Sequence, residues 1–155
     1  MNRNRVRIVV IGLLFALVAP PILAQTANPR FGKWKLKSDN AASTNIMTYE
    51  AWNGTGMKVT VETTRAADGN KSAWGYTTMF DGKEYPVEGR NGTTHAIVRI
   101  VNDKINEIIY KNGDRVTQLL VNVLSADGKT IEVTYYSASQ DGSTRVTNAT
   151  YEKMQ

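Results

Sequence analysis

The C-terminal third of the chain repeats one short unit, in which an apolar or β-branched run is followed by a two-residue turn. The turns are Asn112-Gly113, Asp127-Gly128 and Asp141-Gly142. A type I′ hairpin turn needs a positive φ at both central residues, which glycine adopts freely and asparagine or aspartate tolerates. Three such turns in succession predict an antiparallel meander that ends with a strand over residues 144–153.

The preceding part of the chain shows the same pattern of short runs and turns. Met57, Val59 and Val61 alternate with polar side chains and define one apolar face, which is typical of a half-buried strand. Pro86 fits its short strand only at an edge or a bulge. About ten strands are predicted, over residues 31–37, 46–52, 57–64, 72–80, 84–87, 94–101, 105–111, 115–124, 130–137 and 144–153.

The fold class that follows is all-β, because no segment has the pattern of a helix of ordinary length. Two arrangements fit sequential hairpins: a sandwich of two sheets, and an antiparallel up-and-down meander barrel of about 8–10 strands. The absence of a long crossover favours the barrel, which also removes the exposed sheet edges.

The predicted strand at residues 115–124 breaks the regular alternation. Leu119, Val121 and Val123 share one parity, whereas Leu120 and Leu124 lie on the other. A β-bulge near Gln118 and Leu119 would produce this change of phase, and bulges commonly bend barrel strands. A strand covered on both faces is the alternative.

Residues 1–24 have the composition of a secretory signal peptide, with three arginines ahead of a continuous apolar run at residues 8–19. This run is shorter than the roughly 20 residues that a spanning helix needs, and Pro20 and Pro21 end it. We expect cleavage after about Ala24. The protein is then periplasmic or secreted, with no stable membrane anchor.

The remaining chain divides into a short polar tail, residues 25–30, and a single β-barrel domain, residues 31–155. The leader holds three of the 19 basic residues and none of the 14 acidic ones, so the net charge falls from +5 to +2. The basic balance is therefore weak support for a nucleic-acid partner, and none is expected. The chain has no cysteine, and a domain of this length can bury enough surface without disulfides.

The inventory of catalytic side chains is small. His95 is the single histidine and cysteine is absent, so a zinc site of several histidines or cysteines cannot form. A Ser-His-Asp triad would have to use His95, yet no Gly-x-Ser-x-Gly turn occurs. We expect no catalytic residue, no metal and no cofactor, and therefore not an enzyme.

Short motifs along the chain resemble those of a known group. Residues 32–34, Gly-Lys-Trp, resemble the Gly-x-Trp signature that opens the first strand of lipocalins, and residues 127–130 and 150–153 resemble lipocalin-like and fatty-acid-binding-like barrels. The chain is also similar to small exported bacterial proteins with Asp-Gly-Lys-x-Tyr-Pro in the middle, here residues 81–86. The resemblance implies a small calycin-type barrel.

A structural latch is also implied by this resemblance. In lipocalins the tryptophan of the first strand packs against an arginine carried near the last strand. The residues that would take these roles here are Gly32, Trp34 and Arg145.

The strand aromatics form either a packed core or the wall of a cavity that holds one small ligand. Small residues of the same parity, such as Thr63 and Thr78, leave room inside. Arg99 shares the parity of His95 and Ile97 and is expected to point inward, where a guanidinium needs an anion. The candidate cavity residues are Trp74, Tyr76, Arg99, Tyr135 and Arg145, with the two arginines as candidates for a ligand carboxylate.

Two functions remain open from the sequence. The first is an exported barrel that binds a small hydrophobic or amphipathic ligand without catalysis. The second is a solid barrel that acts as an envelope protein-interaction or inhibitor module through its loops at residues 38–45 and 89–93. The volume of the interior distinguishes them.

Overall fold

The computed structural model describes residues 28–38, 42–139 and 141–155, which form an all-β fold of ten antiparallel strands. The expected signal peptide, residues 1–24, and residues 25–27 of the polar tail lie outside the described residues. No helix in the described part of the chain is long and apolar enough to cross a membrane. The strands are β1 (Gly32–Leu36), β2 (Ser43–Trp52), β3 (Gly56–Arg65), β4 (Lys71–Thr78), β5 (Asp81–Glu88), β6 (His95–Asn102), β7 (Ile105–Asn112), β8 (Arg115–Leu124), β9 (Thr130–Ala138) and β10 (Thr144–Lys153).

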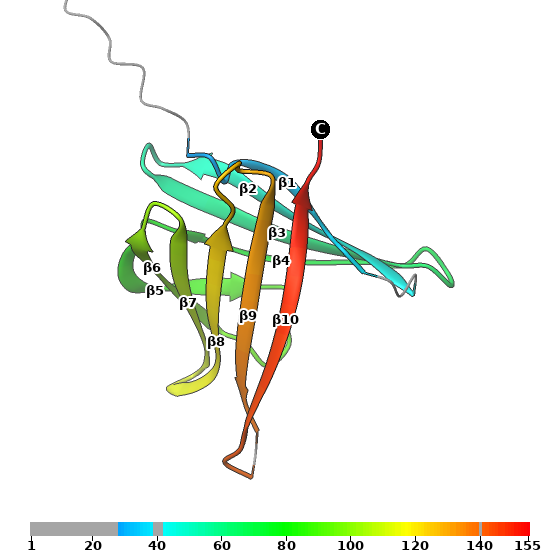
Figure 1. Cartoon of the computed structure of the whole chain (residues 1–155). Coiled ribbons are helices and arrows are strands. Elements are labelled where there is room, and N and C mark those ends of the chain that lie inside the picture. Colours follow the sequence, from blue (N-terminus) through cyan, green and yellow to red (C-terminus); the bar gives the residue numbers. More distant parts are fainter. Residues whose placement is uncertain (1–27, 39–41, 140) are drawn as a thin grey trace, which may run out of the picture.

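The strands close into an up-and-down barrel. Each pairs with its neighbour in sequence, and β1 completes the ring by pairing with β10 (Figure 1). The closing register aligns Trp34 with Lys153 and Leu36 with Tyr151. The barrel predicted from the hairpin order is therefore confirmed, and the sandwich is excluded. In Figure 1 β2 to β4 run across β8 to β10, and the β3–β4 and β9–β10 hairpins extend beyond the body.

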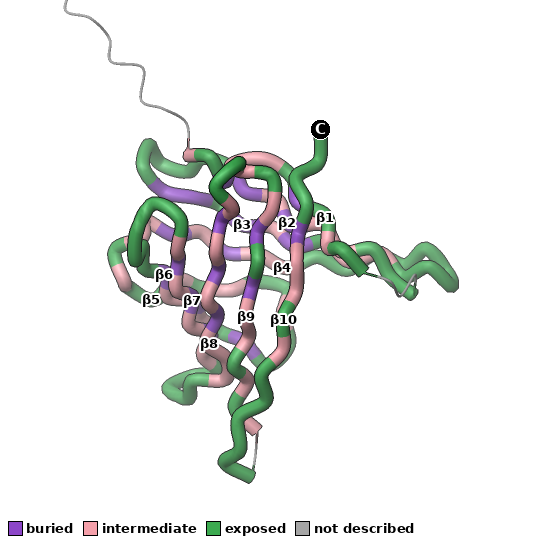
Figure 2. Tube along the Cα trace, in the orientation of Figure 1, coloured by how far each residue is buried: buried purple, intermediate pink, exposed green. Residues whose placement is uncertain are grey.

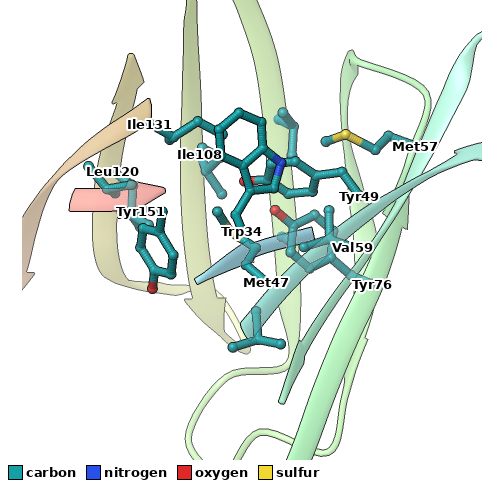
Figure 3. Close-up of a cluster of buried hydrophobic side chains, with 14 of the residues drawn as sticks. Trp34, Met47, Tyr49, Met57, Val59, Tyr76, Ile108, Leu120, Ile131 and Tyr151 are labelled. Carbon is teal, nitrogen blue, oxygen red and sulfur yellow. The ribbon is translucent and has the colours of Figure 1, made fainter. Parts of the chain in front are cut away.

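Strict alternation along the strands places one face of each inside the barrel. On β3, Met57, Val59 and Val61 are all buried, as the sequence predicted. Buried positions recur on strands around the ring, so the core occupies the barrel axis (Figure 2). Trp34 is fully buried among these side chains, as Figure 3 shows.

The hairpin turns lie where they were predicted, but most have a different backbone conformation. Asn53 (φ 42°) and Gly54 (φ 79°) both have positive φ, as a type I′ turn requires. At the three C-terminal turns only the glycine does, since Asn53 and Phe80 are the non-glycine residues with positive φ in the described part of the chain. The type I′ assignment of those three turns was therefore wrong.

Side-chain hydrogen bonds explain how the C-terminal turns are stabilised instead. Asp127 Oδ1 accepts the backbone N–H of Lys129 at 3.0 Å, and Asp141 Oδ1 accepts that of Ser143 at 2.9 Å. Aspartate satisfies a turn amide two residues further on without leaving the right-handed region. Asn-Gly and Asp-Gly pairs thus support hairpins by two different routes, a type I′ turn at Asn53-Gly54 and aspartate side-chain bonds at the turns of Asp127 and Asp141.

The bulge predicted in β8 is present. Tyr110 on β7 is opposite Gln118, but Lys111 is opposite Val116, so Thr117 is the extra residue. The Thr117 hydroxyl donates to the backbone carbonyl of Tyr110 at 3.2 Å. After this bulge Leu120 is buried in the barrel, whereas Leu119 lies on the outer face.

The β4–β5 pair has the fewest residues in register of any strand pair in the ring. The two register pairs are Gly75 with Glu88 and Tyr76 with Val87. The Val87 N–H donates to Thr94 O on the β6 side, so the nitrogen of Pro86 faces β4. Proline has no N–H to donate, and the ladder ends at this point. The expected place for Pro86, at an edge or bulge, corresponds to this gap.

Candidate functional site

The barrel encloses a cavity of about 210 Å³. Its walls come from β2 to β4, from β7 to β10 and from the loop after β5. Tyr49, Tyr76 and Leu120 are among the labelled side chains that point into the interior in Figure 3. The lining residues are Asn45, Met47, Tyr49, Val59, Val61, Trp74, Tyr76, Arg90, Ile108, Tyr110, Leu120, Asn122, Val133, Tyr135 and Tyr151.

Five tyrosines among these lining residues give the apolar wall a set of hydroxyl groups. The Tyr151 hydroxyl donates to Asn45 Oδ1 at 3.3 Å and lies 3.5 Å from the Tyr135 hydroxyl. Asn122 Nδ2 donates to the Tyr49 hydroxyl at 3.2 Å. The cavity is therefore amphipathic, with aromatic faces and fixed polar atoms.

Burial determines the protonation state of these tyrosines. It raises the pKa of Tyr110 to about 12, although Arg90 and Tyr76 act in the opposite direction. Burial is also the largest cause that raises the pKa of Tyr49, Tyr76 and Tyr135 above its ordinary value. All these hydroxyls stay protonated at neutral pH, so they can donate hydrogen bonds to a ligand.

Arg90 supplies the charge of the cavity. Its guanidinium carbon lies 4.6 Å from the centre of the Trp74 ring and 4.5 Å from that of Tyr110. The two rings meet edge to face at a centroid distance of 5.8 Å. Arg90 Nη2 also donates to Gln118 Oε1 at 3.1 Å. Contacts from three strands therefore hold a cation that the loop at residues 89–93 carries into the barrel.

No carboxylate balances this cation in the cavity. The lining residues include neither aspartate nor glutamate, and the ion pairs found in the described part of the chain leave Arg90 out. The interior is thus positively charged. An anion placed beside Arg90, which is partly buried, would be attracted to its charge.

A second arginine closes the other end of the barrel. Arg30 is only 3% exposed and donates to the side-chain oxygen of Asn122 and, at 2.7 Å, to the carbonyl of Lys104. Trp34 Nε1 donates to the Arg30 carbonyl at 2.8 Å. Residue 30, expected to belong to a polar tail, is instead part of the barrel floor.

The expected latch is only partly as predicted. Trp34 occupies the barrel floor. Gly32 is the first residue of β1, and a Cβ atom added to it would lie 3.4 Å from Lys153 Cε. The cation over the Trp34 ring is Lys153 Nζ, at 5.1 Å, and not Arg145. Arg145 is exposed at the start of β10, opposite Ser137. The register puts the end of β10 beside β1, which leaves Arg145 at the opposite end of its strand.

The predicted cavity residues lie partly inside and partly outside the barrel. Trp74, Tyr76 and Tyr135 line the cavity, whereas Arg99 and Arg145 are exposed and do not. On β6 the inward parity belongs to Ala96 and Val98, so the inward orientation expected for Arg99 was wrong. His95, on the same outer parity, is only partly buried and has Nδ1 3.0 Å from the Thr94 hydroxyl.

The strand aromatics considered from the sequence include Tyr49 and Tyr110, but these two were not selected as candidate cavity residues, and Arg90 was not considered. Tyr49 and Tyr110 share the strand parity of the apolar residues Met47 and Ile108, and this signal could have placed them inside. Arg90 lies in a Gly-Asn loop outside any strand, where no periodicity predicts the direction of a side chain. Only the folded loop brings it to the aromatic rings.

No protein-family model matches this chain, and no curated protein is significantly similar to it. The function is therefore argued from the chemistry of the cavity.

Proposed function

We propose that the protein is an exported, non-catalytic barrel of the lipocalin-like type that holds one small amphipathic molecule in its interior. The observation that carries this proposal is the cavity of about 210 Å³ inside a closed ring of strands. Ligand sites in proteins are concave, mainly apolar, and have a few fixed polar groups. The interior of this barrel is concave and combines apolar side chains with a few fixed polar groups.

The composition of the wall supports binding over catalysis. Its apolar part is aliphatic as well as aromatic, from residues such as Met47, Val61 and Leu120. The lining contains no histidine, carboxylate, serine or threonine that could act as a base or nucleophile. The tyrosines have raised pKa values and are weak bases as phenols at neutral pH.

A matched pair of variants on β8 tests interior binding. Leu120 lines the cavity, whereas Leu119 lies on the outer face beside it. Phenol, a small neutral amphipathic probe, should shift the NMR signals of the cavity residues in the natural protein. Leu120→Trp should fill the cavity and abolish these shifts, and Leu119→Trp should leave them.

Binding that survives in Leu120→Trp, or phenol shifts confined to the outer surface, would overturn the proposal. Native mass spectrometry of the protein purified from its source adds a direct readout, since a retained small molecule increases the mass. Export has its own test. The N-terminal sequence of the protein from the cell envelope or medium should begin near Gln25.

A second candidate function is an envelope interaction module, and a feature of the outer surface favours it. Five apolar side chains lie in register on the outside of β6 to β10, each opposite the next: Ile97, Ile109, Leu119, Tyr136 and Val146. Tyr136 is 38% exposed and Val146 is 53% exposed. Contiguous exposed apolar surface is characteristic of protein contacts.

This outer stripe differs from the loops first considered as contact surfaces. Residues 39–41 of the loop at 38–45 lie outside the described residues, and in the other loop Arg90 turns into the barrel. A photo-crosslinking residue placed at position 146 tests the stripe in cells. A defined adduct that disappears with Tyr136→Ser would support the module, while the same adduct from position 99, outside the stripe, would exclude it.

A further inference from the structure

We propose that the molecule held in the barrel is a small carboxylic acid, either aromatic or short-chain, and that Arg90 binds its carboxylate. The inference rests on the proposed function, because it names the ligand class of the same cavity. Four observations carry it: the way Arg90 is held, the charge around it, the hydroxyl groups near it and the volume available.

The guanidinium of Arg90 is fixed before any ligand arrives. The Trp74 and Tyr110 rings lie against it at 4.6 and 4.5 Å, so its plane is held by aromatic contacts. Gln118 is oriented in turn, since its Nε2 donates to Ser137 Oγ at 2.8 Å and leaves Oε1 to accept from Arg90. A preorganised donor loses little entropy on binding, which favours affinity.

The hydrogen-bonding capacity of this guanidinium exceeds what the protein uses. Arginine has five N–H donors in a planar fork, and a carboxylate accepts two of them in parallel. The bond to Gln118 and the contact with Tyr110 occupy only part of that capacity. The lining has no acidic side chain that could compete for the rest.

The hydroxyl groups add donors that favour the same kind of ligand. Tyr110 lies against Arg90, and Tyr76 stacks on Trp74 with ring centroids 6.4 Å apart and meets Tyr110 edge to face at 6.0 Å. Both tyrosines are protonated phenols at neutral pH, and burial raises the pKa of each further above its ordinary value. A carboxylate accepts from such donors, whereas an ammonium ligand would meet a cation and no anion.

The volume limits the ligand to a small molecule. A cavity of about 210 Å³ corresponds to roughly seven water-sized groups at about 30 Å³ each. One aromatic ring with an acid group, or an aliphatic acid of similar size, can be enclosed. A long-chain fatty acid would leave most of its chain outside the barrel.

Calorimetric titration with benzoate, and with benzamide as its neutral isostere, tests the inference on the natural protein. We expect benzoate to bind at least about tenfold more tightly than benzamide, as a charge-assisted pair predicts. Benzylamine, the cationic counterpart, should bind more weakly than benzamide. Equal affinity for benzoate and benzamide would overturn the role of the carboxylate.

Substitutions test whether Arg90 is the arginine that binds the carboxylate. Arg90→Gln should lower benzoate affinity by about tenfold to a hundredfold and keep benzamide affinity within about twofold. Arg90→Lys keeps the charge without the planar fork and should give an intermediate benzoate affinity. Arg99→Gln is the matched control, because it removes the same charge from the outer face and should leave both affinities unchanged.

The outcomes separate this inference from the proposed function. If phenol, benzamide and benzoate all fail to bind, interior binding itself is wrong. If the neutral probes bind and Arg90→Gln does not reduce benzoate affinity, the carboxylate site is wrong while the binding barrel stands. Should Arg90→Gln fail to fold, shown by circular dichroism, the comparison of benzoate with benzamide on the natural protein still decides.

Discussion

Arg30 and Arg90 are both taken into the barrel, but their surroundings give them different roles. Arg30 is sealed by protein acceptors, Asn122 and the Lys104 carbonyl, and burial lowers its pKa. Arg90 is held mainly by aromatic faces. The first arginine is satisfied by the fold, and the second would offer its remaining donors to the proposed ligand.

Replacing Arg30 tests its structural role. Arg30→Met keeps an unbranched apolar stem but leaves the Asn122 side chain and the Lys104 carbonyl without their donor. We expect the free energy of unfolding to fall by about 2–4 kcal/mol, measured by equilibrium denaturation in urea. Arg145→Met, at an exposed position, should change it by less than about 0.5 kcal/mol. Equal losses in the two variants would contradict the assignment.

The buried tyrosines predict instability in alkali. Burial raises the pKa of Tyr110 from 10.0 to about 12 in the folded protein. Above pH 10 the unfolded chain therefore loses this proton first and binds fewer protons than the folded state. The stability from the neutral phenol is complete below pH 10 and is lost as the pH rises towards 12.

Urea midpoints measured through this interval should fall steadily. Tyr110→Phe should make the decline shallower, because it removes one of the groups responsible. A midpoint that stays constant between pH 10 and 12 would show that these hydroxyls are not buried as the structure has them.

Among the elements, β5 leads into the loop that brings Arg90 to the cavity. Pro86 ends its ladder with β4, and Gly89 turns the chain so that Arg90 enters the barrel. Gly89 has a φ of +77°, and a Cβ atom added to it would lie 2.4 Å from the carbonyl oxygen of Ala73. Only glycine meets both requirements.

The requirement for positive φ and the requirement for close approach can be tested separately, because Gly54 and Gly89 have similar φ values but different space at the Cβ position. Gly54, at φ +79°, has open space where a Cβ would lie. Gly54→Ala should cost about 1–2 kcal/mol of unfolding free energy for the backbone conformation alone. Gly89→Ala should cost about 1–3 kcal/mol more, because the methyl group meets the β4 backbone. The same loss in both variants would argue against the close approach of Gly89 to β4.

For the molecule as a whole, closure depends on a short contact between the ends of the chain. Three register pairs join β1 to β10. Near them, Met154 N donates to Lys33 O at 2.8 Å and Lys153 Nζ donates to Pro29 O at 3.0 Å. The floor and the seam of the barrel are thus built from the same two segments.

Deleting residues 151–155 tests this closure. The deletion removes all three β10 residues in register with β1, together with a wall residue of the cavity, Tyr151. We expect loss of the cooperative unfolding transition, followed by circular dichroism, because β1 and the remaining part of β10 then present open edges. Deletion of Gln155 alone should preserve it. A cooperative transition in the shorter chain would show that closure is dispensable.

The sequence by itself determined the barrel, because its information is local. Asn-Gly and Asp-Gly pairs specify hairpins, alternation specifies which face is buried, and sequential hairpins leave little choice of topology. The bulge in β8 could also be predicted, because a one-residue insertion changes the parity of every apolar residue that follows.

Only the tertiary structure decided which charges lie inside. Arg99 was expected to point inward, but the parity of β6 is set by the burial of Ala96 and Val98. Arg145 was expected at Trp34, but register brings Lys153 there. Arg90 had no strand pattern to predict it, since a loop follows the contacts available to it and not a period. The charged residues of the site were therefore determined by strand register and by the course of the loop after β5. Both are set only when strands distant in sequence pack together.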